Sequence, residues 1–211
     1  MKNKFLRRYT DLPALICLLK EKKITLLDPM SWDDSNDSHY LTVYKSKKGL
    51  KTLLALCFTQ VSETYHHWKV FADGSSGICI KFKRDELISS AEKRDGVKTG
   101  KVEYLKLKDA KKRKPTIDEL PFIKRYAFED EDEFRIIFES TDLILPIKNI
   151  PIPLSSIEKV TLSPWAPPIL AKHVKEILKS IPGCENLDIV RSTLIGNNEW
   201  KSIGGFIRTK R

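Results

Sequence analysis

The chain has 211 residues, of which 41% are hydrophobic, and a formal net charge of +10. This size and composition predict a single domain over residues 1–211, and the motifs discussed below span about residues 5–162. No run of about 18 apolar residues is present, and the N-terminus lacks the apolar core of a secretory signal. We therefore expect a cytoplasmic protein that does not span a membrane.

Cysteine and histidine content argues against a metal site. Cys17, Cys57, Cys79 and Cys184 lie far apart among apolar neighbours, without the paired spacing of zinc sites, and predict reduced core residues. There are four histidines, and the adjacent His66 and His67 cannot supply a metal site unaided, which disfavours a metalloenzyme. Glycine-rich phosphate loops and a Ser/His/Asp nucleophile pattern are also missing.

The first half of the chain alternates predicted strands and helices. Asp11 is a predicted N-cap, with Pro13 in the first turn of a helix that runs to about residue 22. Continuously apolar residues predict a buried central strand at 53–59. The remaining predicted elements are strands at 5–9, 24–27 and 78–82 and a short helix at 64–72.

Two polar or aromatic segments of this half are functional candidates. The loop 28–37 surrounds Trp32 with short polar side chains, which either cap turns and helices or order a substrate loop. The helix 64–72 carries Tyr65, His66, His67, Trp68 and Phe71. That is more aromatic surface than packing of so short a helix requires.

Positive charge is concentrated between Lys93 and Lys114, where ten Lys or Arg residues stand against three Asp or Glu residues. Lys111, Lys112, Arg113 and Lys114 form the densest part, and Arg208, Lys210 and Arg211 add to the tail. The segment predicts a strand at 101–105 followed by a loop up to Pro115. Such a cluster is either a solvated loop or the electrostatic footprint of a nucleic-acid partner.

The second half completes an α+β pattern. We expect helices at 117–126 and 167–179, strands at 133–138 and 157–162, and short final pieces at 189–190 and 205–207. Few βαβ units are present, which disfavours a doubly wound sheet. The predicted fold is a central, mostly antiparallel or mixed sheet of short strands with flanking helices.

Five consecutive carboxylates, Glu129 to Glu133, run directly into the strand 133–138. Alternation along a strand places Glu131, Glu133 and Arg135 on one face. Two carboxylates in one cleft repel each other, which raises one pKa and allows the pair to bind hydroxyls or exchange a proton. The alternative is a solvated acidic turn in which Arg135 pairs with Glu133.

Short motifs in a fixed order resemble a large bacterial family of unknown function. The motifs are Arg8-Tyr9, Asp33-Asp34-Ser35-Asn36-Asp37, Trp68-Lys69-Val70-Phe71-Ala72, Gly77-Ile78-Cys79-Ile80-Lys81-Phe82 and Glu131-Asp132-Glu133-Phe134-Arg135-Ile136-Ile137. The sequence departs from that family at Phe71, where Tyr is usual, and at the Trp-Asp-Asp start of its acidic loop.

A weaker resemblance is to the ADP-ribosyltransferase fold, including toxins that modify nucleic acids. It implies that NAD is the substrate, that Glu133 bonds the ribose and stabilises its cationic centre, and that Glu131 orients the acceptor. It also implies that Arg8, or Arg7 in its place, holds the pyrophosphate. Tyr9, Trp68 and Phe71 would form aromatic walls, and Thr59 would occupy the middle-strand position.

The resemblance further implies an RNA or single-stranded DNA substrate, a role as a toxin or antiviral defence effector, and an antitoxin partner. Two other functions stay open. One is a non-enzymatic nucleic-acid-binding or regulatory module, in which the acidic run docks on the basic segment. The other is a nuclease holding magnesium with Asp33, Asp34, Asp37 and Glu133.

The ADP-ribosyltransferase and the non-enzymatic binding module predict different surfaces. An enzyme requires Arg8, Tyr9 and Glu133 to converge in one concave pocket. A binding module predicts a flat basic face, with Glu131 and Glu133 either exposed or paired to Lys or Arg.

Overall fold

A computed structural model of the chain describes residues 3–204. The expected short piece at 205–207 and the basic residues Arg208, Lys210 and Arg211 lie outside the described residues. No helix within 3–204 is long and apolar enough to cross a membrane.

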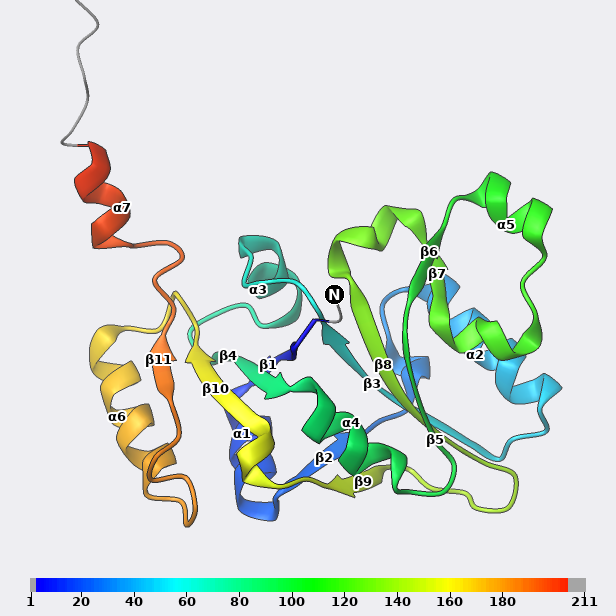
Figure 1. Cartoon of the computed structure of the whole chain (residues 1–211), viewed down its shortest axis with the longest axis horizontal. Coiled ribbons are helices and arrows are strands. Elements are labelled where there is room, and N and C mark those ends of the chain that lie inside the picture. The colour runs from blue at the N-terminus through cyan, green and yellow to red at the C-terminus, as the bar shows by residue number, and fades with distance from the viewer. Residues whose placement is uncertain (1–2, 205–211) are drawn as a thin grey trace, which may run out of the picture.

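A seven-stranded sheet forms the centre of the molecule (Figure 1), in the order β11-β10-β4-β1-β3-β8-β5. Its pairs are antiparallel except for β10 and β11, which are parallel. This confirms the predicted α+β class with a mostly antiparallel sheet. The strands are β1 (Phe5–Asp11), β3 (Thr52–Thr59), β4 (Gly77–Lys83), β5 (Val97–Lys101), β8 (Glu133–Ser140), β10 (Ile157–Leu162) and β11 (Ile189–Arg191). Two further pairs are β2 (Lys23–Leu26) with β9 (Lys148–Pro151), and β6 (Glu103–Leu105) with β7 (Ile123–Arg125).

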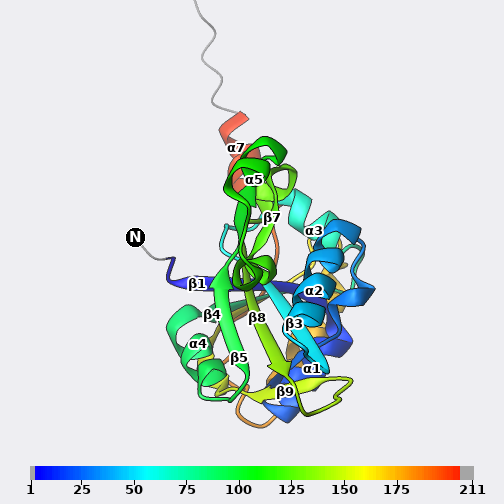
Figure 2. The same cartoon turned by 90° about the vertical axis from the view of Figure 1, so that its right-hand side faces the viewer.

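Helices surround the sheet. In Figure 2, α2 and α3 lie beside each other on one side of the sheet, and α4 lies on the opposite side. The helices are α1 (Leu12–Glu21), α2 (Ser35–Lys47), α3 (Tyr65–Phe71), α4 (Arg84–Glu92), α5 (Leu107–Arg113), α6 (Pro168–Lys179) and α7 (Asn198–Ile203). The main core joins α1, α4 and α6 to one face of the sheet, through residues such as Leu15, Leu87 and Leu178. A smaller cluster joins Leu41 and Tyr44 of α2 to the other face.

The sheet is split in its middle, between β1 and β3. These strands pair at a single register position, Arg7 opposite Thr59, whereas β1 pairs with β4 over its whole length. Farther along β3, Leu27 occupies the gap and exchanges two backbone hydrogen bonds with Ala55, of 3.1 and 2.8 Å. Between these two points the Cys57 carbonyl accepts a hydrogen bond of 3.2 Å from the Arg8 guanidinium. Arg8 therefore takes the place of a missing strand partner.

Local capping agrees with the sequence at several helix starts. Asp11 caps α1, because its side chain accepts a hydrogen bond of 2.8 Å from the Ala14 N–H. Asp34 caps α2 by accepting from the Asn36 and Asp37 N–H groups, and Asp28 caps the 3₁₀ helix Pro29–Ser31. Capping is thus a confirmed role of the polar loop, although the long helix α2 that follows it was not predicted.

Two predictions in the region 101–126 are wrong, and a third is right only in part. The predicted strand 101–105 is interrupted at Val102, so that Lys101 ends β5 and residues 103–105 form β6. The basic segment expected to be a loop contains α5. In place of a helix at 117–126, two 3₁₀ helices, Ile117–Phe122 and Tyr126–Glu131, flank β7. Pro121 lacks the N–H that an α-helix needs, and β7 pairs with β6, a contact that local periodicity does not encode.

The prediction of four core cysteines is also only half right. All four thiols are free, and Cys79 and Cys184 are buried, but Cys17 is exposed and Cys57 is half-buried. Cys17 lies at a solvent-accessible position of α1, and Cys57 lies on the face of β3 opposite the main core, where it lines the pocket described below.

Candidate functional site

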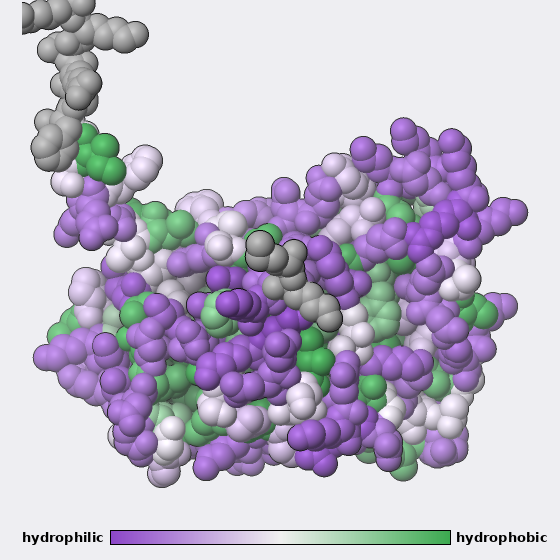
Figure 3. All heavy atoms as spheres, in the orientation of Figure 1, coloured by the Kyte–Doolittle hydropathy of each residue, from purple (hydrophilic) through white to green (hydrophobic). Residues whose placement is uncertain are grey.

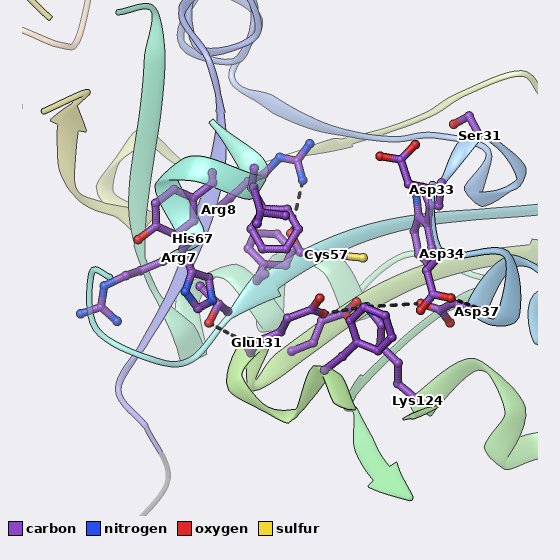
Figure 4. Close-up of a pocket in the computed structure, with 18 residues that line it drawn as sticks. Arg7, Arg8, Ser31, Asp33, Asp34, Asp37, Cys57, His67, Lys124 and Glu131 are labelled. Carbon is purple, nitrogen blue, oxygen red and sulfur yellow. Dashed lines mark hydrogen bonds and ion pairs between the residues drawn. The ribbon is translucent and has the colours of Figure 1, made fainter. Parts of the chain in front are cut away.

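A pocket of about 430 Å³ opens at the split in the sheet (Figure 4). It brings together side chains from both halves of the sheet and from the segments that cover one face. Its lining is Arg7, Arg8, Tyr9, Ser31, Trp32, Asp33, Asp34, Asp37, Cys57, Phe58, Thr59, His67, Val70, Phe71, Lys124, Phe128, Glu131 and Glu133. Of the residues that the sequence placed around NAD, only Trp68 is absent from this lining.

Arg8 is a half-buried cation without a carboxylate partner. Within residues 3–204 no Asp or Glu lies within 4 Å of its guanidinium, and its side chain makes the bond to Cys57 described above. Burial lowers the pKa of Arg8, and the charge of the more distant Asp11 offsets only part of this. A guanidinium carries five N–H donors, so most of them are available to an anionic ligand. Arg7, the rival candidate, donates to the Val61 carbonyl at 2.7 Å.

Glu133 is held by a buried guanidinium on its own strand. Arg135 Nε lies 2.5 Å from Glu133 Oε1, and Arg135 Nη2 lies 3.0 Å from Glu133 Oε2. The same guanidinium forks onto Asp37 of α2, with Nη1 at 2.8 Å from Oδ1 and Nη2 bonded to Oδ2, and it donates to the Pro121 carbonyl at 3.0 Å. All five of its donors are used, and the ion pair expected between Arg135 and Glu133 is present, buried rather than solvated.

Lys124 connects the two acidic residues at the pocket wall. Its ammonium lies 2.6 Å from Glu131 Oε2 and 3.5 Å from Glu133 Oε2. Burial alone would raise the pKa of Glu133, but Arg135 and Lys124 outweigh it and lower that pKa to about 2. Burial raises the pKa of Glu131, which Lys124 only partly offsets, and the Glu133 charge raises it further. The pair is thus divided into a fixed anion and a carboxylate closer to protonation, a division typical of acid and base roles.

Three buried polar atoms within residues 3–204 have no hydrogen-bond partner, and all three belong to pocket residues: Tyr9 OH, Asp34 Oδ2 and His67 Nε2. Buried polar atoms are normally paired, so unpaired ones call for a ligand or water. Burial lowers the pKa of His67, and the nearby Glu131 carbonyl offsets part of this. The His67 Nδ1 already contacts the Thr64 hydroxyl at 2.6 Å, which orients the ring so that Nε2 can serve a ligand.

Aromatic side chains form much of the remaining wall. Phe71 and His67 come from α3, Phe128 from the 3₁₀ helix Tyr126–Glu131, and Tyr9 from β1. Trp68 stands behind this wall: it is fully buried, packs edge-on against Tyr9 with ring centroids 5.1 Å apart, and donates to Glu63 at 2.7 Å. Its role is to support Tyr9.

Thr59 is positioned by the acidic segment. Its hydroxyl donates a hydrogen bond of 2.6 Å to the Glu131 backbone carbonyl, while its backbone forms the one register contact between β1 and β3. Thr59 therefore fixes the position of Glu131 relative to the split.

The four basic residues expected to bind nucleic acid lie together at α5, outside the pocket. Lys111, Lys112, Arg113 and Lys114 are all exposed, but Arg113 forms ion pairs with Glu103 and Glu119. The helix follows β6, whose Tyr104 hydroxyl accepts a 2.9 Å hydrogen bond from the Glu133 N–H. The ammonium groups of Lys111, Lys112 and Lys114 form no ion pair within residues 3–204. Figure 3 shows that the end of the molecule that carries α5 is predominantly hydrophilic.

The carboxylates considered for magnesium are arranged differently from a metal site. Within residues 3–204 no group of three or more His, Cys, Asp or Glu side chains could hold a metal ion. Asp37 and Glu133 instead direct their oxygens at Arg135.

Several pocket residues were missed by the sequence reasoning. Lys124 lies in a segment that suggested an ordinary helix, and Phe128 precedes the acidic run without a motif of its own. His67 was noted among the aromatic residues of the helix 64–72 and was rejected as a metal ligand, but no hydrogen-bonding role in a pocket was predicted for it. The aromatic density of 64–72 was the one signal that could have identified it.

We predict a specific acid sensitivity from Glu133. Because its pKa falls from an ordinary 4.5 to about 2 in the folded protein, its contribution to stability is present above about pH 4.5 and is lost as the pH falls toward 2. Wild type should be more stable than Glu133→Gln at pH 7, and this difference in the free energy of unfolding should decrease by about 3 kcal/mol as the pH falls through this range. Urea unfolding of both proteins at pH 7 and pH 2.5 measures the difference.

The matched control is Glu176→Gln, an exposed residue of α6. Its stability difference from wild type should stay below about 0.5 kcal/mol at both pH values. A wild-type advantage over Glu133→Gln that is independent of pH would contradict the assigned ionisation of Glu133.

Comparisons with solved structures give distant similarities. DarT of Thermus sp. 2.9 in complex with carba-NAD+ has 10% sequence identity and a TM-score of 0.46, over 91% of this chain and 97% of that chain. The same protein in complex with ADP-ribosylated ssDNA has 10% identity and a TM-score of 0.47, over 91% of this chain and 95% of that chain. Curated proteins gave no match.

A family described as "Protein of unknown function (DUF2971)" matches residues 67–136. The matched segment is roughly a third of the chain. It contains the Trp68–Ala72 and Gly77–Phe82 motifs and the acidic motif from Glu131 to Ile136, whereas Arg8-Tyr9 and Asp33–Asp37 lie outside it. The predicted resemblance is therefore confirmed: residues 67–136 carry the sequence pattern of this family of proteins of unknown function.

Proposed function

We propose that the protein is an NAD-dependent ADP-ribosyltransferase that modifies a nucleic acid, RNA or single-stranded DNA. The observation that carries the proposal is a single pocket with two charged groups on different strands: the Arg8 guanidinium, which has no carboxylate partner within residues 3–204, and the Glu133 carboxylate, whose pKa is lowered to about 2. Such a pocket complements a substrate that has a pyrophosphate at one point and develops positive charge at another.

The two ends of NAD make different demands. A guanidinium binds phosphate oxygens through paired N–H donors, which is the role we assign to Arg8. Tyr9 and Phe71 provide aromatic surface for the nicotinamide ring, and the unpaired Tyr9 hydroxyl and His67 Nε2 offer hydrogen bonds to its polar groups. Sequestering the ring in this way limits attack by water.

The reaction breaks the bond between the nicotinamide nitrogen and the ribose carbon. Nicotinamide leaves with the electron pair, and positive charge develops on the sugar. Glu133 is fixed by Arg135 before the substrate arrives, so it can bond a ribose hydroxyl and stabilise that charge without rearrangement. The acceptor then forms the new bond to the ribose carbon, and Glu131, with its raised pKa, orients the acceptor and takes its proton.

The nucleic-acid part of the proposal rests on charge. A net charge of +10 and the free lysines of α5 favour a polyanionic acceptor. A cytoplasmic toxin or antiviral defence effector controlled by an antitoxin protein fits this activity, since modification of nucleic acid would need restraint in the producing cell.

A non-enzymatic binding or regulatory module is the second candidate, and one observation favours it. Glu131 and Glu133 are both paired with basic side chains, Lys124 and Arg135. Within residues 3–204, one ion pair joins the acidic run to the basic segment 93–114, between Lys101 and Asp132 at 2.8 Å. Helix α5 forms no ion pair with the acidic run in this part of the chain.

The central test follows labelled NAD incubated with the purified protein and, separately, total RNA, single-stranded DNA and a cell lysate. Wild type should transfer label to a nucleic acid and release nicotinamide. Glu133→Gln keeps the shape but loses the charge, and should be slower by about 100-fold or more. Glu129→Gln, an exposed residue of the same acidic run that does not line the pocket, should behave as wild type.

Transfer that survives Glu133→Gln would refute the assigned mechanism. Absence of transfer and of nicotinamide release by wild type with every acceptor would favour the binding module.

The α5 lysines are expected to act on nucleic-acid affinity alone. Replacing Lys111, Lys112 and Lys114 by Ala should reduce the slope of log affinity against log salt for a single-stranded oligonucleotide by about 2, since each phosphate contact contributes about 0.7. Fluorescence anisotropy over a salt series measures the slope. NAD hydrolysis without acceptor should not change, and an unchanged slope would exclude α5 from the interface.

A further inference from the structure

A second cavity lies behind Arg8. It has a volume of about 170 Å³ and is lined by α1, β1, the β2 segment, β3 and β4. Its lining is Arg8, Thr10, Ala14, Cys17, Leu18, Lys23, Ile24, Thr25, Leu27, Leu56 and Ile80. Of the residues from 3 to 204, Arg8 alone lines both this cavity and the larger pocket.

The split sheet explains how one side chain reaches both cavities. Along β3, Leu56 belongs to the face covered by the main core, whereas Cys57 belongs to the opposite face. The second cavity contains Leu56, and the larger pocket contains Cys57. Arg8 occupies the gap where β1 and β3 do not pair, and it contributes to the lining of the cavities on both faces.

The polar lining of the second cavity is cationic. Arg8 and Lys23 contribute positive charge, and no Asp or Glu is among the lining residues. The charge of Asp11 acts on Arg8 from a distance, but its side chain caps α1 and forms no ion pair with Arg8. Lys23 pairs with Glu21 at 3.2 Å, a pair in which both side chains are solvent-accessible, and such pairs are weak and easily exchanged.

The hydroxyls differ in what they can offer. The Thr25 hydroxyl donates its proton to Asn149 Oδ1 at 2.8 Å, so it has none left for an anion. Thr10 makes no side-chain hydrogen bond within residues 3–204, so its hydroxyl can donate into the cavity. The volume is too small for a nucleotide but accommodates a single tetrahedral anion with room for water.

We propose that the second cavity is a binding site for a small oxyanion of the phosphate class, held by Arg8, Lys23 and Thr10. The consequence rests on the proposed function: an anion behind Arg8 engages the guanidinium donors that would otherwise hold the NAD pyrophosphate in front. Phosphate should therefore weaken NAD binding competitively, although the two ligands occupy opposite faces of the sheet.

Cys17 provides a test that does not depend on enzyme activity. It is an exposed thiol on the cavity lining, so a bound anion should slow its alkylation. We expect inorganic phosphate to slow labelling of Cys17 by at least 3-fold relative to chloride at equal ionic strength, with the labelled site identified by mass spectrometry. Lys23→Met should lose this protection, and Lys20→Met, an exposed lysine of α1 outside the cavity, should retain it.

Two results of the alkylation experiment would overturn the site. One is equal labelling of the wild type in phosphate and chloride. The other is equal protection in wild type and Lys23→Met, which would indicate an unspecific salt effect.

Calorimetric titration of NAD in chloride and in phosphate then tests the competition. Phosphate should raise the dissociation constant of NAD in wild type by at least 3-fold and leave that of Lys23→Met unchanged. If phosphate protects Cys17 but NAD binds in neither buffer, the oxyanion site is supported and the proposed function is refuted. Protection of Cys17 with an unchanged NAD affinity would refute the competition through Arg8.

Discussion

The Arg135 guanidinium is the interaction on which the site depends. It is fully buried on β8 and uses its five N–H donors on Glu133 of its own strand, on Asp37 of α2 and on the Pro121 carbonyl. Removing it would leave two carboxylates buried without their main countercharge, which is strongly destabilising. One side chain thus fixes α2 on the sheet, places the 3₁₀ segment that leads to Lys124, and keeps Glu133 ionised.

The split between β1 and β3 is the second constraint. A continuous pairing would have joined the Cys57 carbonyl to the backbone of β1 and left no gap for the Arg8 side chain. Because β1 meets β3 only at Arg7 and Thr59, the strands separate and leave room for a pocket on one face and a smaller cavity on the other. Arg8 lies in the gap, so it is the residue for which ligands in the pocket and in the smaller cavity would compete.

Strand periodicity made part of this site predictable. The alternation of Glu133, Phe134, Arg135 and Ile136 gave the strand and the shared face of the two charged residues, and Asp11 with Pro13 gave the start of α1. The order of short motifs also placed Arg8, Tyr9 and Glu133 in one functional set, and the structure brings these three residues to one pocket.

The remaining parts depend on contacts between distant segments. Helix α2 was missed because its buried face, including Leu41 and Tyr44, is a small part of a polar sequence. Lys124 is a pocket residue only because β7 pairs with β6, and the sequence around it suggested a helix. The division of pKa values between Glu131 and Glu133 likewise arises from Arg135 and Lys124, whose positions local patterns do not reveal.

The most direct test of the account is a crystal structure with a non-hydrolysable NAD analogue bound. We predict the pyrophosphate on the Arg8 guanidinium, the nicotinamide beside Tyr9 and Phe71, and a ribose hydroxyl within hydrogen-bonding distance of Glu133. An analogue bound elsewhere, or one seated in the pocket with its ribose turned away from Glu133, would contradict the assignment of this pocket to ADP-ribosyl transfer.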